Sequence, residues 1–118
     1  MYNKRSVGAS QEQKAAEYLK ERGYHILECH FRCRTGEIDV IAKDKNCFVF
    51  VEVKYRKTPS MGFPEEAVGY GKRKKISHTA RFYLVKNHIP VDTPCRFDVV
   101  TILDQEISLI QNAFDAVF

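Results

Sequence analysis

The chain has 118 residues, of which 44% are hydrophobic and 29% are charged, and its formal net charge is +4. This length predicts one domain, residues 1–118, because a chain of this size buries one core and has no room for a second. No stretch approaches the ~20 apolar residues of a membrane span, and the start, Met1 to Val7, lacks the apolar segment of a signal peptide, so we expect a soluble, cytoplasmic protein.

A first helix is predicted between residues 10 and 23. Residues 10–13, Ser-Gln-Glu-Gln, fit a capping box with Ser10 as the N-cap, and Gly23 provides a stop signal. At helical spacing, Glu12 lies on the same face as the apolar Leu19. We therefore expect the Glu12 carboxylate to point toward the protein.

The four cysteines predict no disulfide framework. They are Cys29, Cys33, Cys47 and Cys95, and they form no Cys-x-x-Cys pair. A zinc site would combine His25, Cys29, His30 and Cys33. Alternate residues of an extended segment point to opposite faces, and the spacing matches no usual ligand pattern, so these donors would not converge easily. Reduced, mostly buried cysteines are the favoured interpretation.

A β-hairpin is the clearest β-structure in the sequence. After a short strand at residues 24–29, segment 36–42 alternates in polarity, and segment 47–55 is rich in β-branched and aromatic residues. Residues 43–46 between them have the composition of a turn. Together they predict two antiparallel strands.

The hairpin turn decides which acidic residues are neighbours. If the turn places Lys43 opposite Phe48, then Asp39 faces Glu52, because the strands run in opposite directions. Residues directly opposite each other point to the same side, so charged side chains gather on one face. They are Glu37, Asp39, Glu52 and Lys54.

The rest of the chain predicts a second helix and two more strands. A loop from Thr58 to Pro64 precedes a helix at residues 72–87, in which apolar residues recur at helical spacing. Strands follow at residues 95–102 and 107–110. This order predicts a single mixed sheet flanked by helices, at the border between the α/β and α+β classes.

The positive charge is concentrated in the middle of the chain. Residues 54–86 carry nine basic and two acidic side chains, whereas residues 87–118 carry one and five. The basic segment includes the run Lys72, Arg73, Lys74 and Lys75. Cations are unfavourable in the first turn of a helix, so the run suggests a face that binds a nucleic-acid backbone. A solvated helix face is the simpler interpretation.

Three charged side chains of the hairpin suit divalent-metal chemistry on phosphodiesters. Asp39 and Glu52 offer the hard oxygen ligands that Mg²⁺ prefers, and Lys54 is placed to orient a water or to stabilise developing charge. Glu37 either supports these acids from an outer position or pairs with Arg56. The alternative is a cross-strand ion pair with one spare acid, which contributes little to stability.

These residues resemble the PD-(D/E)xK nuclease motif of the restriction-endonuclease-like fold, here Ile38-Asp39 followed by Val51-Glu52-Val53-Lys54. The wider set of matching motifs comprises Gly8, Glu12, Ala15 and Leu19, Gly-Glu-Ile-Asp at 36–39, residues 50–56, Lys72 and Lys75 ahead of Ala80 and Leu84, and Arg-Phe-Asp-Val-Val at 96–100. This set resembles the YraN-like family of uncharacterised bacterial proteins, which are similar to archaeal Holliday-junction resolvases in fold and acidic cluster.

The resemblance implies Asp39 and Glu52 as metal ligands, Lys54 as the catalytic lysine and Glu12 as a further acidic member of the site. We therefore expect a Mg²⁺- or Mn²⁺-dependent endodeoxyribonuclease that acts on DNA and selects branched or otherwise structured substrates. The resemblance to the resolvases also implies a homodimer. The alternative is a non-catalytic nucleic-acid-binding module or partner subunit with the same fold.

Overall fold

The computed structural model describes the backbone of residues 4–56 and 68–118, and the side chains from Ser10 onward within these ranges. The elements in chain order are α1 (Lys4–Glu21), β1 (His25–Cys33), β2 (Gly36–Asp44), β3 (Cys47–Arg56), α2 (Tyr70–Lys86), β4 (Cys95–Leu103) and β5 (Glu106–Phe114). The predicted loop from Thr58 to Pro64 lies outside the described residues.

The five strands form one sheet in the order β1-β2-β3-β4-β5. Strands β3 and β4 are parallel, and the other neighbouring strands are antiparallel. A parallel pair needs a crossover connection, and α2 lies in the segment between these two strands. The predicted mixed sheet with flanking helices is confirmed, and the fold is a compact domain of the α+β class.

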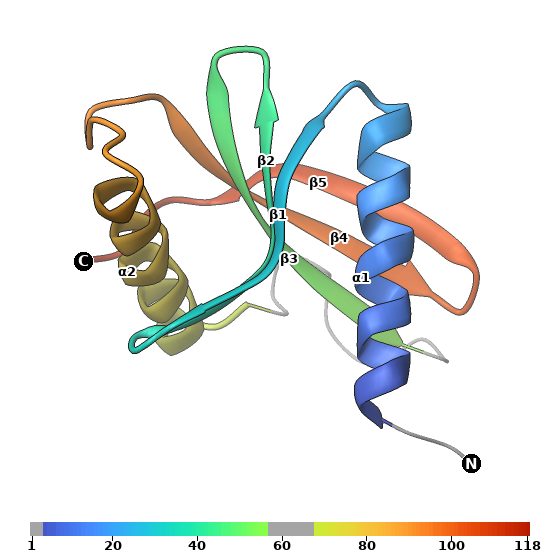
Figure 1. The fold of residues 1–118 in the computed structure, drawn as a ribbon. Coiled ribbons are helices and arrows are strands. Elements are labelled where there is room, and N and C mark those ends of the chain that lie inside the picture. The colour runs from blue at the N-terminus through green and yellow to red at the C-terminus, as the bar shows by residue number, and fades with distance from the viewer. Residues whose placement is uncertain (1–3, 57–67) are drawn as a thin grey trace.

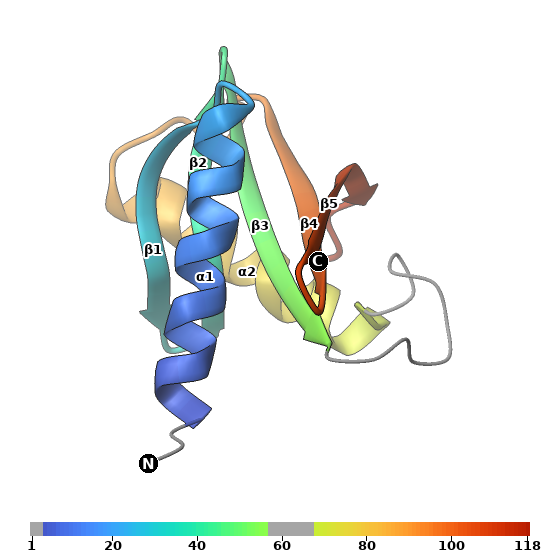
Figure 2. The same ribbon diagram turned by 90° about the vertical axis from the view of Figure 1, so that its right-hand side faces the viewer.

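The sheet lies between the two helices. Figure 2 shows α1 in front of the sheet and α2 behind it, so each face has one covering helix. Leu19 of α1 belongs to the same buried cluster as Val51, whereas Ile76 of α2 belongs to the cluster that contains Phe50. Alternate residues of β3 thus face opposite helices, which explains why this strand is apolar nearly throughout.

The first helix begins earlier than predicted. The capping box placed its start at Ser10, but α1 begins at Lys4, and Ser10 lies inside it. No proline precedes Ser10, and the single Gly8 costs only about 1 kcal/mol in a helix, so nothing stops the helix from extending toward the N-terminus. The predicted stop is confirmed, since Gly23 follows the helix with a φ of 92°.

The hairpin has the predicted register over its paired part. Lys43 lies opposite Phe48, and the pairing continues to Val40 opposite Val51. Beyond this pair, β2 continues alongside β1, and β3 continues alongside β4, so the two strands of the hairpin separate. Figure 1 shows them diverging toward the lower part of the view. We call this opening the fork between β2 and β3.

Both edge strands are irregular and longer than predicted. The pairing of β1 with β2 shifts between residues 26 and 28, and the pairing of β5 with β4 shifts beside Asp98. Asn112 of β5 has a φ of 51°, and its N–H donates a 2.9 Å hydrogen bond to the Asp98 carboxylate. Strand β5 runs to Phe114, beyond the predicted end at residue 110, because this side-chain contact accommodates the extra residues.

Within residues 4–56 and 68–118, neither helix combines the length and the apolar character that crossing a bilayer requires.

Candidate functional site

The four residues predicted for catalysis and metal binding meet at the fork. Strand β2 contributes Asp39, strand β3 contributes Glu52 and Lys54, and α1 contributes Glu12. The Glu12 side chain is only 17% exposed, so it points toward the protein as predicted. Because these residues belong to three different elements, only the complete fold brings them together.

Asp39 is the central carboxylate of the site. Its Oδ2 accepts a 2.8 Å hydrogen bond from the backbone N–H of Val53, which links β2 to β3 across the fork. Burial raises the pKa of Asp39 to about 8, the carboxylates of Glu52 and Glu12 add to the rise, and the Val53 N–H opposes it. A carboxyl group in this situation retains its proton or needs a nearby cation.

Glu52 is the most buried of the three acids and contacts two lysines. Its side chain is 6% exposed, and its Oε1 lies 2.9 Å from Lys72 Nζ and 3.5 Å from Lys54 Nζ. Burial lowers the pKa of Lys72, but the hydrogen bond and the charge of Glu52 outweigh this effect and the net shift is upward. Lys72 was predicted as part of the nucleic-acid-binding run, and its place beside Glu52 was not predicted.

His30 is a member of the cluster that the sequence did not assign to it. Its Nδ1 lies 3.1 Å from Glu12 Oε1, and one ligand atom each from Glu12, His30 and Asp39 lie within 4.8 Å of one another. The pairs on either side of His30 in the β1–β2 ladder place it opposite Asp39. The register between these two strands was therefore the missing signal, because β1 was predicted to end at residue 29.

Glu37 and Arg56 do not pair with each other within the described part of the chain. The Glu37 carboxylate lies 3.3 Å from Arg32 Nε and 3.8 Å from His30 Nε2. Arg56 is exposed at the end of β3, where its carbonyl accepts a hydrogen bond from the N–H of Asp104. Of the two roles considered for Glu37, the geometry favours contact with the acidic cluster through His30.

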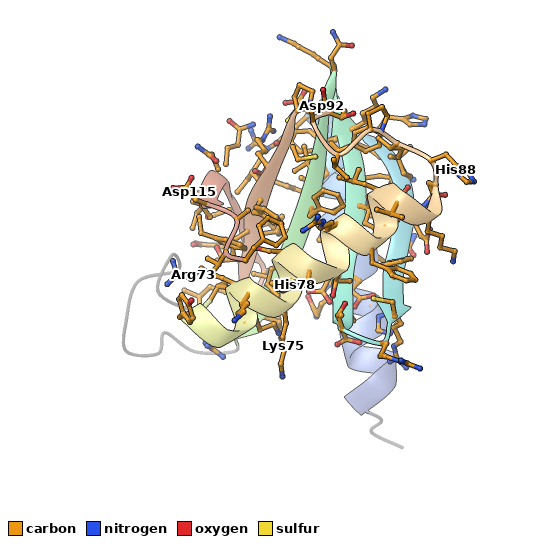
Figure 3. The ribbon with its side chains drawn as sticks, turned by 90° about the vertical axis from the view of Figure 1, so that its left-hand side faces the viewer. Arg73, Lys75, His78, His88, Asp92 and Asp115 are labelled. Carbon is orange, nitrogen blue, oxygen red and sulfur yellow. The ribbon has the colours of Figure 1, made fainter. Side chains whose placement is uncertain are left out.

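The basic run at residues 72–75 includes one lysine that contacts the site and two that are exposed to solvent. Lys72 is directed at Glu52, whereas Lys74 and Lys75 are exposed. Figure 3 shows Lys75 extending away from α2. Arg73 is partly buried, and its Nε has no hydrogen-bond partner among the described residues. Lys74 and Lys75 thus remain available to a polyanion.

The four cysteines are free, but they are less buried than predicted. Cys29 and Cys95 are exposed, and Cys33 and Cys47 are partly buried. The reason for Cys29 is that β1 is an edge strand whose residues 27–30 are uncovered. Cys33 Sγ lies 3.1 Å from the Thr35 hydroxyl, and the metal-donor cluster found within the described residues contains His30 without any cysteine.

A second polar cluster lies at β4 and has a structural character. Asp98 is fully buried, and its carboxylate accepts hydrogen bonds from the Tyr24 hydroxyl at 2.9 Å and from Arg96 Nε at 3.0 Å. Arg96 also donates to Asp44 at 2.9 Å. Each charge has a partner here, in contrast to Asp39 at the fork, which has no ion pair with any described residue.

The donor set at the fork fits a divalent cation. Both nearby lysines contact Glu52, and within the described residues neither Glu12 nor Asp39 has a lysine at ion-pair distance. Carboxylate oxygens are the usual protein ligands of Mg²⁺ and Mn²⁺, and an imidazole nitrogen is a common ligand of transition-metal ions. Burial and the neighbouring carboxylates raise the pKa of Asp39, and a divalent ion would offset both effects.

Related sequences match this chain over nearly its whole length. The profile of the uncharacterised protein family UPF0102 matches residues 11–102. A UPF0102 protein of Lachnoclostridium phytofermentans is 54% identical over 114 residues, which cover 97% of both chains. Relatives from Persephonella marina, 46% identical over 92% of both chains, and from Clostridium botulinum strain 657, 44% identical over 96% of this chain and 97% of the relative, carry the same family name. The chain therefore belongs to the UPF0102 family of uncharacterised proteins.

Proposed function

We propose that this protein is a Mg²⁺- or Mn²⁺-dependent nuclease that hydrolyses phosphodiester bonds of DNA in the cytoplasm, with branched or structured DNA as its substrate. The observation that carries the proposal is the convergence of Glu12, Asp39 and Glu52 beside Lys54 at the fork. The desolvated Asp39 carboxylate is destabilising without a cation, because an unpaired buried charge costs free energy.

The carboxylates of Asp39 and Glu12 would hold the metal ion, and Glu52, whose charge acts on Asp39, would be a further ligand. When bound, such an ion neutralises phosphate charge and lowers the pKa of a coordinated water. The Val53 N–H fixes the orientation of Asp39, so that one carboxylate oxygen is already directed before a ligand arrives. This preorganisation is typical of a ligand set rather than of a solvated surface.

Lys54 would act on the substrate itself. Its side chain is 22% exposed, and its ammonium nitrogen lies 3.5 Å from Glu52 Oε1, beside the acidic cluster. A cation at this place would stabilise the negative charge that develops on the phosphoryl oxygens. Lys72, Lys74 and Lys75 would bind the flanking backbone phosphates.

The same proposal includes a restriction-endonuclease-like fold similar to that of archaeal Holliday-junction resolvases. It is supported by a mixed sheet in which one hairpin carries both Asp39 and the Glu52-x-Lys54 pair, with an acidic residue contributed by the preceding helix. Lys72 of α2 contacts Glu52 at the fork, and Lys75 extends from the same helix into solvent, so α2 would bring positive charge to DNA bound at the fork.

Cleavage assays with purified protein test this function. Branched, flapped and single-stranded DNA would be incubated with Mn²⁺, and we expect cleavage by the natural protein and by Asp92→Asn, in which an exposed acid far from the fork is changed. Asp39→Asn and Glu52→Gln should lose at least about 100-fold in rate. Cleavage that survives both changes would contradict the assignment.

One observation favours a second function, a non-catalytic nucleic-acid-binding subunit. Glu52 already contacts two lysines, as in a structural ion pair, and these contacts compete with a metal ion for its carboxylate. This alternative predicts DNA binding that weakens with salt and with Lys74→Ala and Lys75→Ala, but that does not depend on Mn²⁺. Retained binding without any cleavage would support it.

A further inference from the structure

We propose that His30 is a metal ligand, and that with Glu12 and Asp39 it forms a divalent-cation site that prefers Mn²⁺ to Mg²⁺. The inference rests on the metal site of the proposed function and specifies its ligands and its ion. It concerns a residue on β1, outside the hairpin that carries the acidic motif.

The three donors come from three different elements and still converge. Glu12 lies on α1, His30 on β1 and Asp39 on β2, and their ligand atoms lie within 4.8 Å of one another. This separation is close to that of donors around one ion, since two ligands at about 2.1 Å from a metal are some 3–4 Å apart. Small side-chain rotations would bring the three ligand atoms to the distances required around one ion.

The backbone directs the imidazole into this position. His30 has a φ of 57°, in the left-handed region, whereas its neighbours in β1 remain paired with β2 on both sides. Histidine tolerates this region better than β-branched residues, although it still costs free energy. The strand therefore departs from regular geometry at His30, whose ring contacts Glu12.

Both ring nitrogens face carboxylates. Nδ1 lies 3.1 Å from Glu12 Oε1, and Nε2 lies 3.8 Å from Glu37 Oε2. Metal-binding histidines commonly direct their second nitrogen at a carboxylate, which fixes the ring and increases its basicity as a ligand. In this arrangement Nδ1 binds the ion beside Glu12, and Glu37 orients the ring. The His30 side chain is 41% exposed, which gives an ion a route from solvent.

The chemistry of the set determines the preferred ion. Imidazole is a good ligand for Mn²⁺ and later transition metals, whereas Mg²⁺ is usually bound by carboxylates, phosphates and water. A site with two carboxylates alone would distinguish these ions weakly. Adding one nitrogen donor favours Mn²⁺, so His30 is the residue that sets the selectivity.

Metal binding to the intact protein tests the inference without an activity assay. Calorimetric titration of the chelator-treated protein with MnCl₂ and with MgCl₂ should give tighter binding of Mn²⁺. In His30→Asn, which retains a residue suited to positive φ, Mn²⁺ affinity should fall at least about tenfold, and Mg²⁺ affinity should change by less than about threefold. His25→Asn, at an exposed position of the same strand, should match the natural protein.

Pulsed electron paramagnetic resonance supplies a direct readout of the ligand. The Mn²⁺ complex should display a hyperfine coupling to one imidazole nitrogen, and this coupling should be absent in His30→Asn and present in His25→Asn. Unchanged Mn²⁺ affinity in His30→Asn, or no nitrogen coupling in the natural protein, would overturn the inference.

The two proposals fail in different ways. If Mn²⁺ binding depends on Asp39 and Glu52 and supports cleavage, but His30→Asn binds the ion normally, the nuclease proposal stands and the role of His30 is wrong. If the nitrogen coupling is present and no DNA substrate is cleaved, the metal site with His30 stands and the nuclease proposal is wrong.

Discussion

The backbone N–H of Val53 donates a 2.8 Å hydrogen bond to the carboxylate of Asp39. The two residues lie just beyond the last backbone pair between β2 and β3, so a side chain bridges the strands where their ladder has ended. The bridge satisfies a backbone donor that would otherwise lack a partner in this opening. The acceptor of this N–H is therefore a side-chain carboxylate, whereas in a regular ladder it would be a backbone carbonyl of the neighbouring strand.

The first prediction concerns pH. Burial and neighbouring acids raise the pKa of Asp39 to about 8, so the metal-free folded protein binds a proton here that the unfolded chain releases above pH 4. Stability should therefore fall as the pH rises from about 4 to about 8, by at most about 1.4 kcal/mol per pH unit from this group.

Urea denaturation in the presence of a chelator measures this dependence. The slope should be smaller in Asp39→Asn, whose amide cannot ionise, and Mn²⁺ should restore stability at pH 8 because the ion binds only the folded protein. The same slope in Asp39→Asn and in the natural protein would show that another group is responsible.

The second prediction concerns the two lysines on Glu52. Replacing either Lys54 or Lys72 with Met leaves the other to compensate the buried carboxylate, so each single change should cost no more than about 1–2 kcal/mol. The double variant should lose about 3–5 kcal/mol, because it leaves a buried charge unpaired. Lys74→Met, on an exposed neighbour, serves as the control. Additive losses in the double-mutant cycle would contradict shared compensation.

The third prediction concerns the buried network around Asp98. Asp98→Asn removes the negative charge that Arg96 contacts. It also replaces one carboxylate oxygen, so either the Asn112 N–H or the Tyr24 hydroxyl loses its acceptor. This change should destabilise the protein by about 3–5 kcal/mol. Tyr24→Phe removes the hydroxyl that donates to Asp98 and accepts from Arg96 and Gln111, and it should cost about 1–3 kcal/mol. Neither change should alter Mn²⁺ affinity at permissive temperature, and a weakened metal site in Tyr24→Phe would show that the two clusters are coupled.

The fourth prediction concerns the turn between β1 and β2. Gly36 has a φ of 150°, and a Cβ there would lie 3.3 Å from the buried hydroxyl of Thr79 on α2. Gly36→Ala should therefore cost about 1–3 kcal/mol. Gly71→Ala, in α2, meets no atom within 4 Å and should be neutral or stabilising by up to about 1 kcal/mol. Thermal unfolding of both variants checks the contrast, and equal melting temperatures would refute it.

Sequence patterns predicted the hairpin well because its signals are local. The β-branched run at residues 47–55 and the short turn determine both the strands and the register, and Lys43 indeed lies opposite Phe48. Helix α1 shows the limit of such signals. A capping motif at Ser10 indicates where a helix is able to begin, but the preceding residues can extend it at little cost.

The candidate site was predicted only in part, for a geometric reason. The alternation of side chains along the strands predicted that Asp39, Glu52 and Lys54 share one face of the hairpin. It does not indicate where two neighbouring strands of a twisted sheet separate. The contributions of His30 and Lys72 depend on the β1–β2 register and on the packing of α2, which are tertiary features. A positive φ at a histidine inside a strand has no sequence signature of its own.

The bulges in β1 and β5 bear on how copies of this chain associate. These two strands are the edges of the sheet, and each is interrupted where a straight, continuous edge would present unpaired backbone groups to another molecule. Such interruptions twist an edge and disfavour strand-to-strand extension into larger sheets or aggregates. We therefore expect self-association of this protein, if DNA binding requires two copies, to use helix or loop surfaces and to leave the sheet five strands wide.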